Sequence, residues 1–143
     1  KIILISLFAA LVLNAVEQVW HLWFPLPDAY THELELMMHL GQHLGLFIDL
    51  FVIALVPAVA EEFFFRGFLQ SILLKSAKPR TAILASSLIF GLYHLNPVLL
   101  PFYFVLGLLF GWLVHKTQNI WAAVLAHLIV NGFGVGMIYW VGM

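Results

Sequence analysis

The amino-acid sequence predicts an all-α protein: a polytopic transmembrane bundle of about five spanning helices with one interfacial amphipathic helix. Three observations support this fold class. Hydrophobic residues make up 64% of the 143-residue chain and charged residues only 9%, and the mean hydropathy is +1.04. A soluble domain of this length cannot bury so much apolar surface. The apolar residues also form stretches long enough to cross a bilayer as helices.

The composition limits the functions that we expect. No polar linker divides the chain, so residues 1–143 are predicted to form a single membrane domain surrounded by membrane lipid. The formal net charge is −1, and the absence of a basic patch argues against a nucleic-acid partner. The chain contains no cysteine, which excludes disulfides, thiolate nucleophiles and cysteine metal ligands.

The first predicted helix covers residues 1–24. Lys1 followed by an apolar run also resembles a signal peptide, but the apolar run continues to Phe24 without a clear cleavage site, which favours a spanning helix. Two prolines then end this helix. Residues 31–44 alternate polar and apolar side chains, so we expect an amphipathic helix at the membrane interface.

The next predicted helix, over residues 45–75, is the longest, at roughly 45 Å. Pro57 is predicted to kink or break it. Three further helices are predicted over residues 81–95, 98–115 and 120–141. The last two contain glycine pairs with the small-xxx-small spacing that indicates close helix packing, namely Gly107/Gly111 and Gly132/Gly136.

The basic residues predict the topology. Apart from Arg66, every lysine and arginine falls at Lys1, in residues 75–80 or in residues 116–119. Five spans place all three of these regions on one side of the membrane. The positive-inside rule therefore predicts that Lys1 and both loops are cytosolic and that the C-terminus lies outside.

Three charged residues interrupt the apolar stretch 57–67: Glu61, Glu62 and Arg66. Each charge costs about 2.5–3.5 kcal/mol at the centre of a bilayer on insertion scales, so such residues face a protein interior or a watery cavity and indicate function. Glu62 and Arg66 are spaced i, i+4 and can form an ion pair. Glu61 points about 100° away from Glu62, so the two carboxylates need not do the same work.

Polar residues on three predicted helices fall at similar depths in the membrane. Measured from the cytosolic helix ends at 1.5 Å per residue, Glu61 and His94 both lie roughly 20 Å deep. His127 and Asn131 lie roughly 12 and 18 Å deep and, spaced i, i+4, share a helix face. A spread of about 10 Å is within the effect of helix tilt. We therefore predict one shared site.

A carboxylate with two imidazoles suits the activation of water. Either Glu61 acts as a general base, or His94, His127 and a glutamate hold a catalytic metal that lowers the pKa of bound water. Asn131 and the second histidine can donate hydrogen bonds to a developing oxyanion. Both routes lead to hydrolysis of an amide or ester inside the membrane.

Three motifs occur in order on successive hydrophobic helices: Glu61-Glu62-x-x-x-Arg66, Phe90-x-x-x-His94 and His127-x-x-x-Asn131. With this ordered set the chain resembles the CPBP intramembrane proteases, which include the type II CAAX prenyl endopeptidases and bacterial Abi or bacteriocin-processing relatives. The resemblance covers about residues 50–136.

The resemblance implies a helical membrane protease with a catalytic core over about residues 45–141. It implies that Glu61 and His94 activate the attacking water and that His127 and Asn131 stabilise the oxyanion. Residues with a supporting or substrate-positioning role would be Glu62, Arg66 and Phe90. The implied substrate is a peptide or protein, lipidated ones included. Family members usually carry further helices before this core, so we expect the chain to be incomplete at its N-terminus.

The sequence leaves the cofactor open. The family is described as metalloproteases, yet a metal-free, glutamate-activated water is also argued for it. If a divalent metal such as zinc is bound, the candidate ligands are Glu61, His94 and His127. There is no HExxH motif.

Three functions fit these residues. The first is an intramembrane endopeptidase that hydrolyses a peptide bond with a water activated by glutamate and histidine. The second is a non-proteolytic membrane scaffold or bacteriocin-immunity protein of the same fold. The third is a proton- or cation-coupled transporter, against which the lack of an inverted repeat counts. We favour the first.

Two further polar groups each allow two interpretations. Glu35, His39 and His43 can line one helix face as metal ligands, but the polar face of an interfacial helix is the preferred interpretation. Asn14 and Glu17 in the first helix can reach the cavity, or can lie near the outer interface.

Overall fold

The computed structural model describes residues 1–28, 31–32, 36 and 45–141, and their regular structure is entirely helical. The predicted all-α class is therefore confirmed. The interfacial helix predicted over residues 31–44 lies mostly outside the described residues. The metal interpretation of Glu35, His39 and His43 falls entirely outside them.

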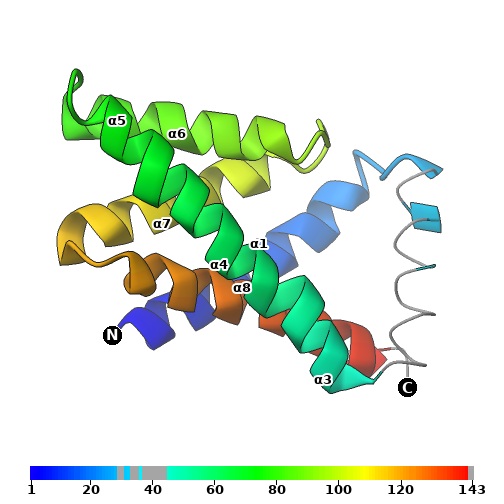
Figure 1. The fold of residues 1–143 in the computed structure, drawn as a ribbon. Coiled ribbons are helices and arrows are strands. Elements are labelled where there is room, and N and C mark those ends of the chain that lie inside the picture. The colour runs from blue at the N-terminus through cyan, green and yellow to red at the C-terminus, as the bar shows by residue number, and fades with distance from the viewer. Residues whose placement is uncertain (29–30, 33–35, 37–44, 142–143) are drawn as a thin grey trace.

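One long helical run carries the charged stretch. It consists of five elements that follow one another without interruption: α3 (Leu46–Asp49), π-helical η1 (Leu50–Leu55), α4 (Val56–Glu62), π-helical η2 (Phe63–Gln70) and α5 (Ser71–Leu73). In Figure 1 the run is a single rod, coloured from cyan to green. The prediction of a break at Pro57 is wrong. Pro57 stands in the first turn of α4, where a missing N–H is tolerated, and the wider π-helical turns precede it.

The other described helices are α1 (Ile2–His21), α6 (Pro79–Tyr93), α7 (Leu100–Thr117) and α8 (Ile120–Val141). Three segments are long and apolar enough to cross a membrane: Ile2–His21, Leu100–Thr117 and Ile120–Met137. Five spans were predicted from the sequence. Helix α6, with 15 residues, is shorter than these three segments and is not among the candidate spans. The long helical run is not among them either, because it is divided into shorter helical elements.

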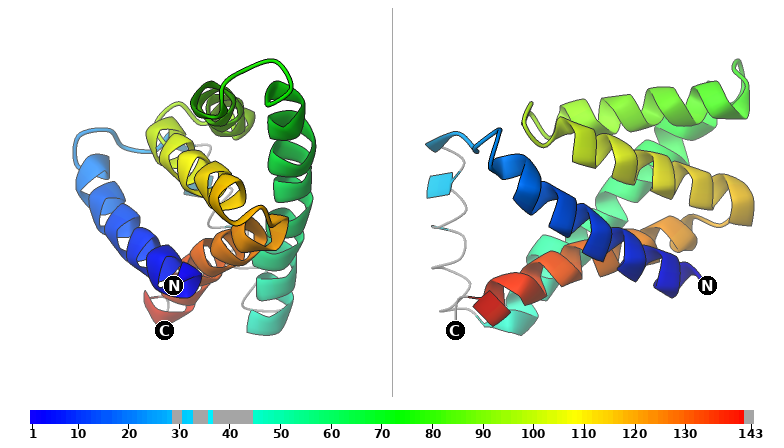
Figure 2. Two further views of the ribbon diagram at one scale, coloured as in Figure 1. Left: turned by 90° about the vertical axis from the view of Figure 1, so that its left-hand side faces the viewer. Right: turned by 180° about the vertical axis from the view of Figure 1, so that it is seen from behind.

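Helix α8 occupies the centre of the bundle, in contact with α1, η1, α4 and α7. Figures 1 and 2 show α1 crossing α8, with its C-terminal end near the loop between α6 and α7. Small side chains on α8, among them the fully buried Ala123 and Ala126, allow neighbours to approach closely. The core beside them contains Phe65, Phe90 and Phe110. Large apolar side chains elsewhere remain exposed, especially on α1, which suits contact with lipid.

The glycine pair of α7 packs as the sequence predicted. A Cβ atom added at Gly107 would lie 2.9 Å from the Cβ atom of Ser87 in α6, and one added at Gly111 would lie 2.6 Å from Oε1 of Gln70. The prediction is wrong for the pair in α8. A Cβ atom at Gly132 would make an ordinary contact at 3.8 Å, and one at Gly136 would meet no described residue within 4 Å.

The two pairs provide a matched test of packing. Gly107→Ala should lower the free energy of unfolding by about 1–3 kcal/mol, because the methyl group has no room against the backbone of Ser87. Gly136→Ala should leave stability unchanged or raise it by about 1 kcal/mol, since alanine favours the helix and meets open space. Thermal unfolding of both variants in the same detergent measures the difference. Equal stability would contradict the close α6–α7 contact.

Candidate active site

The carboxylate of Glu62 is the centre of the polar cluster. Its side chain is fully buried, and its Oε1 atom accepts two hydrogen bonds of 2.9 Å, one from Nη1 of Arg66 and one from Nδ1 of His127. The i, i+4 ion pair predicted from the sequence is therefore present. Because His127 belongs to α8, this one carboxylate joins the long helical run to the central helix.

Arg66 extends the cluster to α7. Its Nη2 atom donates a 2.9 Å hydrogen bond to the carbonyl of Gly107. Its guanidinium carbon lies 4.5 Å from the ring centroid of Phe90 and 5.4 Å from that of Phe110, so cation–π contacts add to the ion pair. Arg66 is 2% exposed. A buried arginine of this kind needs its hydrogen-bond partners in place, since its charge cannot be removed by deprotonation.

Gln70 continues this stripe one turn further along the helix. Its Nε2 atom donates to the carbonyl of Gly111 at 3.2 Å, and its Oε1 atom accepts from the hydroxyl of Ser86 at 3.2 Å. The sequence interpretation missed this residue. The spacing of the residues could have indicated it, because Glu62, Arg66 and Gln70 follow one another at intervals of four along one helix face. Gly107 and Gly111, whose carbonyls Arg66 and Gln70 bind, have the same interval.

Glu61 takes a different position from its neighbour. Its Oε2 atom lies 3.9 Å from Nε2 of His94 and 3.9 Å from Nε2 of His127. Both separations exceed a direct hydrogen bond and suit one bridged by water. Within the described part of the chain, this buried oxygen has no hydrogen-bond partner. The side chain is 19% exposed, whereas that of Glu62 is fully buried.

The hydrogen bonds of the two imidazoles define their proton positions. Nδ1 of His94 lies 2.8 Å from the carbonyl of Phe90, and Nδ1 of His127 lies 2.9 Å from the carboxylate of Glu62. Both partners are acceptors, so each Nδ1 atom carries the proton. In the neutral rings each Nε2 atom therefore presents a lone pair toward Glu61.

Aromatic rings hold both imidazoles in place. His94 stacks on Tyr103 at 3.8 Å between centroids, and His127 stacks on Phe110 at 4.8 Å. Phe90 meets His94 edge-on at 4.8 Å and lies under Arg66. Nothing in the sequence singled out Tyr103 or Phe110, because aromatic residues are common throughout the apolar helices.

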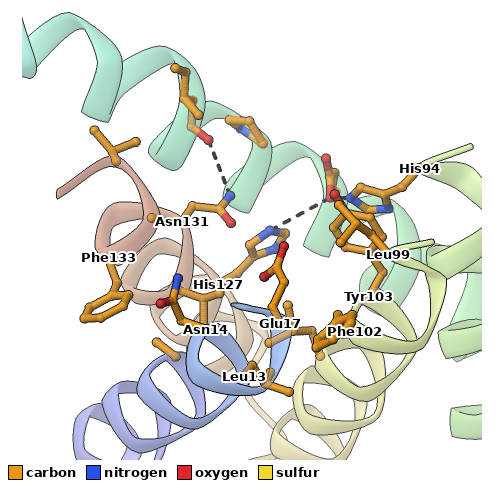
Figure 3. A pocket seen from close by; sticks show the side chains of 18 of the residues that line it. Leu13, Asn14, Glu17, His94, Leu99, Phe102, Tyr103, His127, Asn131 and Phe133 are labelled. Carbon is orange, nitrogen blue, oxygen red and sulfur yellow. Dashed lines mark hydrogen bonds and ion pairs between the residues drawn. The ribbon is translucent and has the colours of Figure 1, made fainter. Parts of the chain in front are cut away.

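Asn131 lies one turn after His127 and is anchored to the long helical run. Its Nδ2 atom donates a 3.4 Å hydrogen bond to the carbonyl of Ile53 (Figure 3). Ile53 belongs to the π-helical element η1, and in an α-helical register its carbonyl would bond to the N–H of residue 57, which is a proline and has none. Pro57 therefore removes one backbone N–H that could compete with Asn131 for this carbonyl.

A cavity of about 470 Å³ connects these groups. Glu61, His94, His127 and Asn131 all line it, whereas Glu62 and Arg66 lie buried behind its wall. Asn14 and Glu17 of α1 line the opposite wall (Figure 3). Of the two interpretations of Asn14 and Glu17, the structure therefore supports the one that places them in the cavity.

The described residues contain no group of three or more His, Cys, Asp or Glu side chains that could hold a metal ion. The metal candidates are separated by 3.9 Å between Oε2 of Glu61 and Nε2 of His94, and by the same distance between Oε2 of Glu61 and Nε2 of His127. We therefore derive no chemical step through a metal.

The chain is thus a helical bundle with three candidate membrane spans and a cavity lined by glutamate, histidine and asparagine side chains, behind which lies a buried ion pair. Comparison with known families is more specific. The chain belongs to the Rce1-like type II CAAX prenyl endopeptidase family, whose model matches residues 43–133. The resemblance to CPBP proteases found in the sequence is thereby confirmed.

One curated relative has a name that describes an activity. The chain is 35% identical over 86 residues to the "Putative membrane peptidase YdiL" of Bacillus subtilis (strain 168). The aligned part is 60% of this chain and 35% of that protein, so the chain spans about a third of the relative's length. No solved structure shows a significant match.

The buried ion pair of Glu62 with Arg66 leads to a prediction about the stability of the fold. Arg66→Met should destabilise the fold by about 3–5 kcal/mol, because Glu62 is left as a buried, poorly compensated charge. The double variant Glu62→Gln/Arg66→Met should regain part of this loss, since no charge remains unpaired. Lys75→Met, at an exposed position near the end of the long helical run, should change stability by about 0.5 kcal/mol or less. Detergent unfolding curves check all three. A double variant no more stable than Arg66→Met would contradict the ion-pair account.

Proposed function

We propose that this protein is an intramembrane endopeptidase in which Glu61 and His94 activate the attacking water. The observation that carries the proposal is the position of Glu61: its Oε2 atom has no hydrogen-bond partner within the described residues and lies 3.9 Å from the Nε2 atoms of two imidazoles, in the wall of a cavity. A water molecule on the cavity side could bridge Glu61 to either imidazole. Family membership supports the same reaction class.

The proton transfers follow from the tautomers. A water bound between Glu61 and His94 donates one hydrogen bond to the carboxylate and the other to the free lone pair of Nε2. Glu61 removes a proton as the water oxygen forms a bond to the carbonyl carbon of the substrate. The carbon–nitrogen bond then breaks, and the same proton passes to the departing amine. The net reaction is the hydrolysis of one peptide bond, and Glu61 and His94 return to their starting protonation states.

Asn131 and His127 are placed to stabilise the negative charge on the carbonyl oxygen. The Nδ2 atom of Asn131 uses one N–H on Ile53 and retains a second for the oxyanion. His127 can donate from Nε2 only when it carries a second proton. The carboxylate of Glu62, hydrogen-bonded to Nδ1, orients the ring so that Nε2 faces the cavity. Glu62 and Arg66 would thus support the catalytic groups from behind the cavity wall, and Phe90, which lines the cavity, would support His94 or position the substrate.

The site would act on a peptide segment that enters the membrane. The chain is proposed to be a multi-pass integral membrane protein, with Lys1 and the loops at 75–80 and 116–119 cytosolic and the C-terminus outside. The three long apolar segments provide a minimum for its spans. The cavity is lined by apolar side chains as well as by the polar groups, so a lipidated or apolar substrate segment would be compatible with it.

The proposal predicts the effect of removing the base. Glu61→Gln and His94→Ala should each reduce the cleavage rate by about 10²–10⁴-fold, because each removes a proton acceptor beside the water. Asp28→Asn, which removes an exposed carboxylate outside the cavity, should leave the rate unchanged. The assay is cleavage of a membrane-peptide library by protein reconstituted in lipid nanodiscs, read by mass spectrometry.

The outcome also distinguishes the alternative functions. Full cleavage by both Glu61→Gln and His94→Ala would refute the mechanism. If the wild-type protein cleaves nothing while its cellular phenotype survives Glu61→Gln, a scaffold or immunity function is supported. Glu61-dependent ion flux in liposomes would support a transporter instead.

The anchoring of Asn131 gives a second prediction. Asn131→Ala should lower kcat by about 10²–10³-fold, the loss expected for one oxyanion donor. Pro57→Ala should lower kcat less, because a restored backbone N–H competes for the carbonyl of Ile53. In the Asn131→Ala background, Pro57→Ala should have no further effect on kcat. Additive losses in the double variant would show that Pro57 acts in some other way than through Asn131.

A further inference from the structure

Helix α1 presents one continuous face to the catalytic cavity. The lining residues Ala10, Leu13, Asn14 and Glu17 follow the i, i+3, i+4, i+7 spacing of a single helix face. This wall is fixed in place. Ala10 is buried where α1 packs on α8. At the other end, Nε1 of Trp20 donates a 3.1 Å hydrogen bond to the carbonyl of Val98.

The polar groups on this face are not used by the mechanism proposed above. Oδ1 of Asn14 accepts a hydrogen bond from Nε2 of Gln18 at 3.0 Å, which orients the amide and leaves its N–H groups as donors. An oxygen of Glu17 lies 3.4 Å from Nε2 of His21, one turn further along. In Figure 3 the carboxylate of Glu17 points from α1 into the cavity shared by His127 and Asn131.

The charges around the cavity all have one sign. Among the described residues that line it, Glu17 and Glu61 carry a formal charge at neutral pH, and both are acidic. Arg66 does not offset them in the cavity, because it is buried behind the wall and bonded to Glu62. A partly enclosed space of this kind concentrates a negative potential, which attracts cations and repels anions. His21, if protonated, would neutralise Glu17 in part, but it does not line the cavity.

We propose that Glu17, assisted by Asn14, makes the α1 wall of the cavity a specificity site for a cationic residue near the scissile bond. The inference rests on the proposed endopeptidase function and adds a substrate class to it. A lysine or arginine side chain of the substrate pairs with the carboxylate of Glu17. Its apolar stem lies against Leu13 and Ala10. An N–H of Asn14 donates to a backbone carbonyl of the extended substrate segment.

The site also rejects one kind of ligand. A substrate segment with Asp, Glu or a free carboxylate at this position would face two carboxylates within the same cavity, and the repulsion between like charges disfavours its binding. The preferred substrates are therefore segments with a basic residue next to an apolar run, cleaved at an internal bond. Glu17 is a specificity residue and takes no part in the chemical step.

The test uses the nanodisc-reconstituted protein and a library of apolar membrane peptides with Lys, Gln or Glu at randomised positions. Mass spectrometry gives the residue frequencies around each cleaved bond. The wild-type protein should prefer Lys over Glu near the cleaved bond by about tenfold in kcat/KM, the ratio equivalent to about 1.4 kcal/mol. Glu17→Gln should remove the preference, and Glu17→Lys should reverse it toward Glu. Both changes should act mainly through KM for peptides with a charge.

Two controls separate this inference from the function on which it rests. Glu17→Gln and Glu17→Lys should cleave the uncharged Gln peptides at rates close to wild type, because the catalytic groups are untouched. Asp28→Lys, which adds the same charge outside the cavity, should keep the wild-type preference. An unchanged preference in Glu17→Lys would overturn the inference while leaving the endopeptidase function intact. A wild-type protein that cleaves no peptide would overturn both.

Discussion

A single buried carboxylate sets the arrangement of this bundle. Glu62 has no contact with solvent, and its charge is tolerated because one oxygen accepts hydrogen bonds from both Arg66 and His127. Arg66 must then be satisfied in turn, which brings the carbonyl of Gly107 within 2.9 Å. Gly107 also leaves no room for a Cβ atom, because Ser87 of α6 packs directly against it. The long helical run, α7 and α8 are thus fixed relative to one another through one ionic cluster.

Glu61 and Glu62 are adjacent in the sequence but point in directions about 100° apart around the helix, so their environments differ. Glu62 turns inward to the cluster, where its Oε1 atom is bonded to both Arg66 and His127. Glu61, about 100° around the helix, reaches the cavity wall, where its Oε2 atom stands apart from two imidazole nitrogens at 3.9 Å each. The paired carboxylate positions His127 through Nδ1, and the unpaired one faces the Nε2 atom of the same ring. This separation of a structural from a reactive carboxylate is the physical basis of the proposed mechanism.

The backbone of the long helical run also contributes to the site. Two π-helical stretches flank the α-helical turns that carry Glu61, and such departures from α-helical bonding are often found at functional sites. Pro57 lies between them. The sequence suggested that this proline would break the helix, and that expectation ignored the partners available in the folded chain. The carbonyl of Ile53 that Pro57 cannot bond is taken by Asn131 from α8, so the helix continues past the proline.

The sequence by itself determined the helical membrane class, the ion pair of Glu62 with Arg66 and the candidate group of Glu61, His94, His127 and Asn131. Those features depend on composition, on i, i+4 spacing within one helix and on depth along a helix axis, all of which can be counted along the chain. The tertiary structure decided that Glu62 is also bonded to His127 and which tautomer each imidazole adopts. It also decided that Gln70, Tyr103 and Glu17 belong to the cluster or cavity, and that the helix survives Pro57. These outcomes depend on the rotation of each helix about its axis and on contacts between helices, which no spacing within one helix specifies.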